Sequence, residues 1–471
     1  MTALAALRLP RPRLRRIRPI LIVAASIAIV GGSYVANALR PAPVRPPVVQ
    51  PAGAAQPAGA AQPALTAPGD APNGATTGLA AIDHALKAWT TNLARNSNDF
   101  LSATYIATLY DARGRLTGDI GDYSRAQTAV AEALAVVPDY ATAQVLHARL
   151  LQTLHDFPGA LAAAQAILEK DPSVLQALAT AGDAKLELGD VKGAAVSFAS
   201  LETQAPGAAV TARLSRLAFI EGDTKSAVSL AQRAWDEASA AGQTGASLGW
   251  YAYLAGMTAI STGSPDAALS WFQKALAVWP DSYLAIAGAA RAQAALGHVD
   301  AAIASYQQAI AIAPQPDALT ALGDLYALKG EDKLAADQYA TVEAIGRLAA
   351  INQQVYNRQL VLFSVNHERD LAEALRLAQQ ELEVRRDAYG YDAEAWALLA
   401  NGRASDAEAA ITKALAFGTR DALLLYHAGE IANALGDTAK ARDLLGQALA
   451  VDGALDPLSA SRAQSSLETL R

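Results

Sequence analysis

Residues 182–206, GDAKLELGDVKGAAVSFASLETQAP, contain the pattern that decides the fold of this chain. The marker residues of the pattern are Gly182, Gly189, Ala194, Phe198, Leu201 and Pro206. A glycine in the middle of such a stretch stops one helix in a left-handed cap, and the acidic residue after it begins the next helix. A proline cannot continue the hydrogen-bond ladder of the second helix. The stretch therefore predicts two helices joined by a tight turn.

The same pattern recurs with a period of 34 residues. Pro138, Pro172 and Pro206 are 34 residues apart, and so are Pro280 and Pro314. The interval of 74 residues between Pro206 and Pro280 leaves room for one more repeat with a six-residue insertion. Counted back from the prolines, small residues recur 12 positions earlier (Ala126, Ala160, Ala194, Ala268, Ala302) and glycines 17 positions earlier (Gly121, Gly189, Gly263, Gly297). A period this strict is typical of stacked helix pairs, and a generic helical bundle would not keep it.

Helix pairs of this kind depend on their neighbours. Small residues on both helices allow the two helix axes to approach closely. One pair cannot bury its apolar face alone, so consecutive pairs stack into a curved solenoid that is stabilised by contacts between neighbours. We therefore expect an all-α solenoid with an extended concave surface.

The pattern resembles the tetratricopeptide repeat (TPR) family, in which small, aromatic and proline positions recur over 34 residues. The resemblance is good over residues 107–346, poor over residues 347–390, and returns over residues 391–456. It implies a TPR-like helix-turn-helix solenoid of about ten repeats, with an opening helix over residues 78–95 and a closing helix over residues 458–470. The predicted parts are a TPR array (78–346), an irregular helical segment (347–390), and C-terminal TPR-like repeats with a capping helix (391–471).

The beginning of the chain predicts export. Residues 1–18 carry six arginines and no acid, and residues 19–39 carry no charge. About 20 apolar residues span the hydrocarbon core of a bilayer, and an excess of arginine keeps the N-terminus in the cytoplasm. We therefore expect a basic cytoplasmic N-terminus, a transmembrane anchor over residues 19–39, and an extracytoplasmic body. The alternative is a signal peptide cleaved after Ala38, which would give a secreted protein.

A tether and an acidic body follow the predicted anchor. Residues 40–77 are rich in Pro, Ala and Gly, and such a segment cannot bury enough apolar surface to offset the entropy lost on ordering. The net charge is +7 for residues 1–75 and −14 for the remainder, so the body lacks the basic face that nucleic-acid binding requires. The absence of cysteine excludes a disulfide framework, a thiolate metal site and a thiol nucleophile.

The resemblance also implies a groove lined by the first helix of each pair. The residues that follow the small residue of that helix are expected to face the groove, together with two aromatic residues about one turn earlier. They are Arg149, Asp183, Arg216, Met257, Arg291 and Asp324, with Trp250 and Tyr253. Arginine and aromatic residues dominate binding hot spots, so we expect a protein or peptide partner here. The alternative is that these are solvated helix positions without a ligand. The Lys and Asn set of the family's carboxylate clamp is not found, which argues against capture of a peptide C-terminus.

Motifs that carry chemistry are scarce. Residues 245–249 match the GxSxG pattern of hydrolases, but that nucleophile follows a strand, and the segment before it is predicted to be helical. None of the six histidines has a second ligand at helical spacing. No phosphate-binding glycine loop is present. We therefore expect no enzymatic activity, no metal ion and no cofactor.

The resulting hypothesis is a protein-interaction scaffold or adaptor that presents a concave TPR groove outside the membrane and helps to assemble a complex. A second hypothesis is an exported protein that senses a small ligand or peptide through the region of Trp250 and Tyr253. A third is a catalytic activity within residues 347–390. Self-association is left open as a further use of the exposed surface.

Overall fold

A computed structural model describes residues 78–351, 357–451, 453 and 455–470. The chain divides into two units, residues 1–62 and 63–471, and every described residue belongs to the second unit. The predicted N-terminus, transmembrane anchor and tether (residues 1–77) lie outside the described residues. Among the helices that are described, none is long and apolar enough to cross a membrane.

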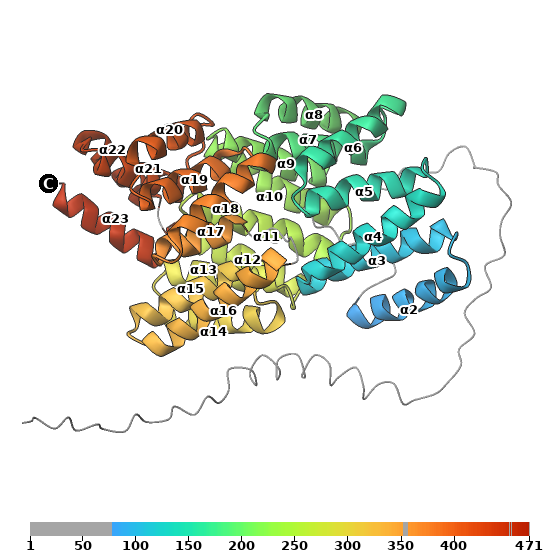
Figure 1. Ribbon diagram of the computed structural model, residues 1–471, viewed down its shortest axis with the longest axis horizontal. Helices are drawn as coiled ribbons and strands as arrows, with labels where there is room; N and C mark the ends of the chain where they lie inside the picture. The colour runs from blue at the N-terminus through green and yellow to red at the C-terminus, as the bar shows by residue number, and fades with distance from the viewer. Residues whose placement is uncertain (1–77, 352–356, 452, 454, 471) are drawn as a thin grey trace, which may run out of the picture. The chain divides into compact units, whose positions relative to one another are not determined.

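The described residues form 22 helices, and all their regular structure is helical. Helix α2 (Leu79–Arg95) precedes ten helix pairs, and α23 (Pro457–Thr469) follows them (Figure 1). The first helices of the pairs are α3 (Phe100–Thr117), α5 (Ala141–Thr153), α7 (Leu175–Glu187), α9 (Ala208–Ile220), α11 (Gly245–Ser261), α13 (Tyr283–Ala295), α15 (Pro316–Leu328), α17 (Asn357–Asn366), α19 (Ala388–Ala400) and α21 (Ala422–Ala434). The second helices are α4 (Ile120–Val136), α6 (Phe157–Lys170), α8 (Val191–Gln204), α10 (Thr224–Ala240), α12 (Pro265–Val278), α14 (Val299–Ile312), α16 (Asp332–Ile351), α18 (Leu371–Val384), α20 (Ala404–Leu415) and α22 (Thr438–Ala450). The predicted all-α repeat array is confirmed.

Small residues allow the two helices of a pair to pack closely. A Cβ atom added to Gly182 in α7 would lie only 2.5 Å from the ring of Phe198 in α8. The same arrangement joins Gly256 in α11 to Phe272 in α12, at 2.6 Å. Real Cβ atoms do not approach other atoms so closely, so these positions must remain glycine for the aromatic ring to fill the space. The recurring small and aromatic positions of the sequence are therefore packing positions.

The turns within the pairs follow the predicted chemistry, with one correction. Gly189 ends α7 with a left-handed φ of 82°, and Asp190 caps α8 by accepting a backbone N–H. In the first pair, the expected turn glycine Gly121 lies inside α4, and Gly118 takes the left-handed conformation instead, with φ 70°. Asp119 caps α4 by accepting the N–H of Gly121 at 2.9 Å. The first turn therefore begins three residues before the position that the period predicts.

The segment predicted to be irregular, residues 347–390, contains the end of α16, the pair α17 and α18, and the start of α19. Helix α17 has 10 residues, whereas α15 has 13. The turn between α17 and α18 has no glycine, and Glu368 and Asp370 take left-handed φ values of 54° and 38°. The array thus continues through this segment, although its sequence lacks the marker residues.

Loops far apart in the sequence meet within the array. The backbone N–H of Arg386, after α18, donates to the carbonyl of Glu187 at the end of α7 (3.0 Å). The hydroxyl of Thr419, before α21, donates to the carbonyl of Ile220 at the end of α9 (2.7 Å), across 199 residues. Figure 1 shows the orange helices α18 and α19 beside the green helices α7 and α9. Each contact joins the turn within one helix pair to the loop between two later pairs. These later pairs are the fifth and the sixth after it along the chain. One superhelical turn of the array is therefore stacked on the next.

The glycines of the turns show where this stacking occurs. A Cβ atom at Gly189 would lie 2.5 Å from the carbonyl oxygen of Arg386, and one at Gly222 would be closer still to the carbonyl oxygen of Gly418. In the last pairs, no described atom lies within 4 Å of the corresponding Cβ position. These open turns are those of Gly330, Gly402 and Gly436. The early turns are covered by later junctions, and the late turns are uncovered.

Candidate functional site

The predicted groove residues are distributed over six consecutive first helices, from α5 to α15. Their side chains have different surroundings. Asp183 and Asp324 are buried, Met257, Trp250, Tyr253, Arg149 and Arg291 are half-buried, and Arg216 is exposed. Only some of the predicted groove residues therefore reach solvent.

Two of these residues form ion pairs between neighbouring repeats. Arg149 in α5 pairs with Asp111 in α3. Asp183 in α7 pairs with Arg213 in α9 at 2.9 Å, and both side chains are at least 94% buried. Because a buried charge is tolerated only with a partner, these pairs link one first helix to the next. Asp111 and Arg213 were not found from the sequence, although the regular spacing between repeats is a signal that could have identified them.

Asp324 has a different set of partners. It accepts a hydrogen bond from Tyr339 Oη in α16 (2.7 Å) and lies 2.7 Å from His367 Nε2, just after α17. The ring of His367 lies against the ring of Tyr339, with centroids 4.4 Å apart. These contacts join the pair α15/α16 to α17. Asp324 therefore links α15 to α16 and to the residue after α17, where the repeat pattern is weakest.

Glu187 is the centre of a buried network that crosses between superhelical turns. Its carboxylate pairs with Arg216 of α9 and with Arg385, which follows α18. Arg385 Nε donates to Glu187 Oε2 at 2.6 Å, and Asp387 lies 3.4 Å from the same guanidinium. Burial alone would raise the pKa of Glu187, but the two arginines outweigh it and hold the pKa well below its usual range. Arg216, predicted to bind a partner, is thus already paired on one side.

His155 lies at the edge of the same network. It occupies the turn between α5 and α6 with a left-handed φ of 61°, and its ring stacks on Phe157. The Arg385 guanidinium lies 5.1 Å from the centroid of Phe157. Burial, with a smaller contribution from Arg385, lowers the pKa of His155 to about 4. His155 is therefore neutral near pH 7.

The predicted aromatic residues pack mainly into the interior. Trp250 and Tyr253 have ring centroids 5.3 Å apart. Trp250 packs against the buried cluster that includes Tyr251, and Tyr253 packs against the cluster that includes Phe272. Their size serves the packing between α10, α11 and α12, so they present little surface to a ligand.

A cavity of about 260 Å³ opens between α9 and α11. Arg216 and Met257, both predicted groove residues, lie in its wall together with Tyr389 from α19. The remaining lining residues are Ala212, Ser215, Phe219, Ala231, Ala234, Leu254, Thr258 and Ser261. Burial raises the pKa of Tyr389 well above its usual range, so its hydroxyl stays protonated and can donate a hydrogen bond. The cavity combines an apolar wall with a cation and a phenol, and two superhelical turns contribute to it.

Two carboxyl groups, those of Asp317 and Asp421, reach water but are partly surrounded by helices. Asp317 is exposed and Asp421 is half-buried, yet burial among the surrounding helices raises the pKa of both carboxyl groups. The charge of Arg291 acts in the opposite direction on each. Both carboxyl groups therefore ionise less readily than a fully solvated carboxyl group would.

A second cavity, which the sequence did not indicate, lies near the C-terminal end. It has a volume of about 510 Å³, with Trp396 and Tyr426 in its wall and Arg462 from α23. The other lining residues are Val365, Asn366, Glu368, Leu371, Leu399 and Ala400. Trp396 Nε1 donates to Asn366 Oδ1 at 2.8 Å, which fixes the indole. The strained residue Glu368 lies in the same wall. The cavity was missed because it combines residues of α19 and α21 with residues of α17 and α18, where the repeat phase is lost, and of the closing helix.

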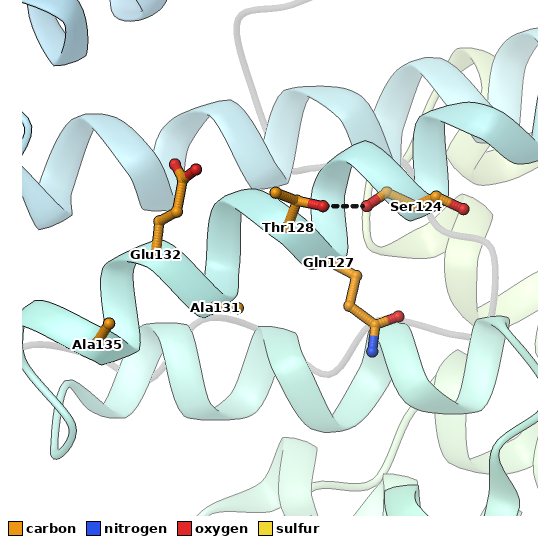
Figure 2. A pocket seen from close by; sticks show the side chains of 6 residues that line it. All are labelled: Ser124, Gln127, Thr128, Ala131, Glu132 and Ala135. Carbon is orange, nitrogen blue, oxygen red and sulfur yellow. Dashed lines mark hydrogen bonds between the residues drawn. The ribbon is translucent and has the colours of Figure 1, made fainter.

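Two other features each belong to a single helix. Figure 2 shows an open hollow along α4, lined by Ser124, Gln127, Thr128 and three further residues of the same helix. Its lining contains one charged residue, Glu132, and no aromatic residue, and Thr128 is hydrogen-bonded to the backbone of Ser124 (3.1 Å). The GxSxG match at residues 245–249 forms the first turn of α11. Among the described side chains, no group of three His, Asp or Glu residues is arranged to hold a metal ion.

Comparison with known proteins adds a family match. A sequence model of the tetratricopeptide repeat matches residues 112–173, 145–209, 253–315 and 287–350. A search of curated proteins found no match. Similar solved structures include the human IFIT1 dimer with PPP-AAAA (15% identity, 79% of this chain and 87% of that chain, TM-score 0.43). They also include MamA (21%, 35% and 92%, TM-score 0.28) and a tetratricopeptide repeat protein from Parabacteroides merdae (17%, 55% and 97%, TM-score 0.32). These TM-scores are all below 0.5, and no inference is drawn from them.

Proposed function

Because the chain is a tetratricopeptide repeat protein over residues 112–209 and 253–350, we propose that it is a scaffold that binds a segment of another protein on the inner face of its helix pairs. Solenoids of stacked helix pairs present extended concave surfaces of this kind. The observation that carries the proposal is the cavity between α9 and α11. There the cation of Arg216, the thioether of Met257 and the phenol of Tyr389 converge.

The chemistry of that cavity favours a particular kind of segment. Arg216 keeps 44% of its side chain exposed although it pairs with Glu187. Arg, Tyr and adaptable Met side chains are enriched where proteins bind each other. The rest of the wall combines alanine, Leu254 and Phe219 with the hydroxyl residues Ser215, Thr258 and Ser261, and its apolar part suits one apolar side chain. We therefore propose an extended segment with an apolar residue next to an acidic one.

The proposed location is outside the cytoplasm, with residues 19–39 as the membrane anchor and residues 40–77 as the tether. The support is the sequence: the arginine excess before an uncharged stretch. In this arrangement the scaffold assembles a complex at the membrane surface. Fractionation and protease treatment of spheroplasts, whose outer envelope has been removed, test this location. We expect the body to be digested from outside and to remain with membranes, whereas deletion of residues 1–39 should leave it in the cytoplasm. Protection of the full-length body in spheroplasts would contradict export.

Site-specific photo-crosslinking tests the scaffold. A photoreactive amino acid replaces Met257 in the full-length chain, and a matched variant carries it at Thr128, in the outer hollow of Figure 2. We expect one protein to crosslink to position 257 in cells and not to position 128. Arg216→Glu should abolish this product because it reverses the charge in the cavity wall. Equal products at both positions, or none at either, would reject the inner-face scaffold.

A small ligand is the second candidate, and the cavity at Trp396 is the observation that favours it. Its volume of about 510 Å³ is within the range of small-molecule sites, which is roughly 300–1,000 Å³. Native mass spectrometry of the protein purified from its source should then show a bound compound that Trp396→Ala loses. If the wild type carries no added mass and gives the crosslink at position 257, the small-ligand candidate fails and the scaffold stands.

A further inference from the structure

Within one chain, the two superhelical turns are stacked through one kind of contact, which occurs more than once. A turn within a pair presents its left-handed glycine and the carbonyl two residues before it, and a later junction lies directly on both. Glu187 and Ile220 supply these carbonyls, and they accept from Arg386 N–H and the Thr419 hydroxyl. Carbonyls at a helix C-terminus have no partner within their helix. The contact therefore satisfies groups that every pair in the array exposes.

The last turns of the array have the same geometry and no cover. Their glycines, Gly330, Gly402 and Gly436, have φ values of 75°, 73° and 79°, close to the 82° of Gly189. No described atom lies within 4 Å of the Cβ positions at these three glycines. Leu328, whose carbonyl stands two residues before Gly330, keeps an exposed side chain. This end of the array therefore presents a surface of the kind that is covered between α7 and α18.

The first junctions of the array are uncovered in the same way. Gly207 and Gly242 lie in the junctions that follow α8 and α10, and no described atom lies within 4 Å of their Cβ positions. At the corresponding junction glycine of the second half, Gly418, an added Cβ atom would lie 3.2 Å from the carbonyl oxygen of Glu221. The chain thus has open junctions at one end and open turns at the other, which are the two halves of its own internal contact.

Exposed charges of both signs lie at these two surfaces. Lys329 and Arg403 stand beside the open turns, where Arg403 pairs with Asp406 at 2.7 Å, and Asp139 and Asp171 are exposed in the junctions that follow α4 and α6. Within one chain, Lys329 pairs with Asp300, whose side chain is 87% exposed, and Asp139 pairs with Lys170, which is 64% exposed. Exposed ion pairs contribute little to stability, so these groups can exchange partners at low cost. Glu331 also lies at the turn, where it is 3.6 Å from Lys329.

We propose that a second copy of this chain stacks on the open turns through its open junctions. In the register of the internal contact, the turn of Gly402 meets the junction of Gly207, and Lys329 then approaches Asp139. The two surfaces differ from each other, so the contact is heterologous and does not close after two copies. The product is a head-to-tail series of chains. The junction loops and turns carry this contact, which leaves the cavity at Met257 free for a partner.

The absence of native cysteine makes a clean test available. Two single-cysteine versions of the full-length chain, Ser405→Cys beside the open turn and Gln204→Cys beside the open junction, are mixed in a mild detergent with a bismaleimide crosslinker. Both positions are exposed. We expect a crosslinked pair from the mixture, little from either variant alone, and a ladder of products from the double variant. Thr128→Cys, also exposed, is the matched control and should give no pair with either.

Charge reversal separates specific stacking from collision. Lys329→Glu or Asp139→Lys should remove the crosslink, and the two reversals, each on the partner that carries the adjacent cysteine, should restore it together. Circular dichroism checks that each variant remains helical. A product from Ser405→Cys alone that equals the mixed product would indicate a two-fold contact and overturn the head-to-tail arrangement. The absence of product from the mixture would overturn self-stacking altogether. Neither result bears on the photo-crosslink at position 257.

Discussion

Single residues in this array act mainly as links between repeats. Glu187 illustrates this best, because one buried carboxylate binds Arg216 of the next pair and Arg385 of the next superhelical turn. Removing one member of a buried ion pair leaves the other charge uncompensated, which typically costs several kcal/mol. Glu187 is therefore the residue at which the greatest effect of a single substitution is expected.

The first prediction concerns Glu187→Gln. This variant should lower the free energy of local opening at residues 187–190 and 385–387 by about 3 kcal/mol, because the buried Arg385 loses the nearest of its carboxylate partners and keeps only Asp387 and Glu381, at 3.4 and 3.6 Å. Native-state hydrogen exchange measures both segments. Glu202→Gln is the matched control: Glu202 pairs with Arg233 at 3.4 Å and both are half exposed, so the change should be within about 0.5 kcal/mol. Equal effects of the two variants would contradict the linking role.

The second prediction is an acid-dependent loosening at His155. The pKa of His155 is lowered from 6.5 to about 4 in the folded chain. Between these values the unfolded chain binds more protons than the folded one, so stability falls as the pH drops through this window. His155→Asn, which tolerates the left-handed conformation, should flatten the pH dependence of the unfolding midpoint from pH 6.5 to 4. An unchanged slope in the variant would assign the effect to other groups.

Glu187 extends the same trend to lower pH. The pKa of Glu187 is depressed in the folded state, so its stabilisation is complete above the value of an unfolded glutamate, about 4.3, and is lost as the pH falls further. With Glu187→Gln, the loss of hydrogen-exchange protection below pH 4 at residues 385–387 should disappear. The residual slope between pH 6.5 and 4 should remain, since it belongs to His155.

At the scale of the helix and its turn, the array contains two kinds of left-handed glycine. Gly189 and Gly222 are covered by carbonyl oxygens from the next superhelical turn, and Gly402 is open. An alanine at any of the three pays for the left-handed conformation, roughly 1–2 kcal/mol. Only the alanines at Gly189 and Gly222 would also place a methyl group against the backbone of the next superhelical turn.

The third prediction follows from this difference. Gly189→Ala and Gly222→Ala should destabilise the array more than Gly402→Ala, and Gly189→Ala should also remove hydrogen-exchange protection at Arg386 N–H. Gly402→Ala has the same conformational cost and should leave that protection unchanged. Thermal unfolding and exchange at residue 386 measure the two effects. If the three variants behave alike, the contact between the covered turns and the loops of the next superhelical turn is contradicted.

At the scale of the whole array, superhelical stacking makes the stability of early pairs depend on late ones. Stability in ordinary repeat arrays is a sum of terms for single repeats and for neighbouring interfaces. The fourth prediction is that ending the chain at residue 346 will reduce exchange protection at residues 187–190 and 220–223, although all sequence neighbours of these turns remain. The open junction at residues 171–174 is the internal control and should not change. Unchanged protection at all three sites would mean that neighbouring pairs alone stabilise the array.

The helix pairs could be predicted from the sequence because their determinants are local. Gly182 and Phe198 lie 16 residues apart, and the period repeats their relation along the chain. The turn at Gly118 was misplaced by three residues because Gly121 satisfied the period equally well. Residues 347–390 were predicted only as an irregular helical segment because the turn between α17 and α18 uses Glu368 and Asp370 in place of glycine.

The surroundings of the candidate site could not be predicted, because they depend on curvature accumulated over several pairs. Nothing near Glu187 in the sequence indicates Arg385, which lies 198 residues later. Likewise, Tyr389 enters the wall around Met257 only because successive superhelical turns are stacked. Residues named from the first-helix positions alone were therefore a mixture of packing, ion-pair and cavity-lining groups.

The stacked turns also limit how the gene for such a protein can change length. Most solenoids tolerate the gain or loss of a unit, since each unit contacts only its neighbours. Here, a duplicated unit inserted between residues 223 and 385 would move Arg385 away from Glu187 and shift the other cross-turn contacts by one place at the same time. The six extra residues before Pro280 fit this constraint, because they fall around Gly242 and Gly245, where nothing described is packed against the loop. The number of helix pairs in one superhelical turn is therefore fixed by the cross-turn contacts. Short loop insertions leave this number unchanged, whereas the insertion of a whole unit changes it.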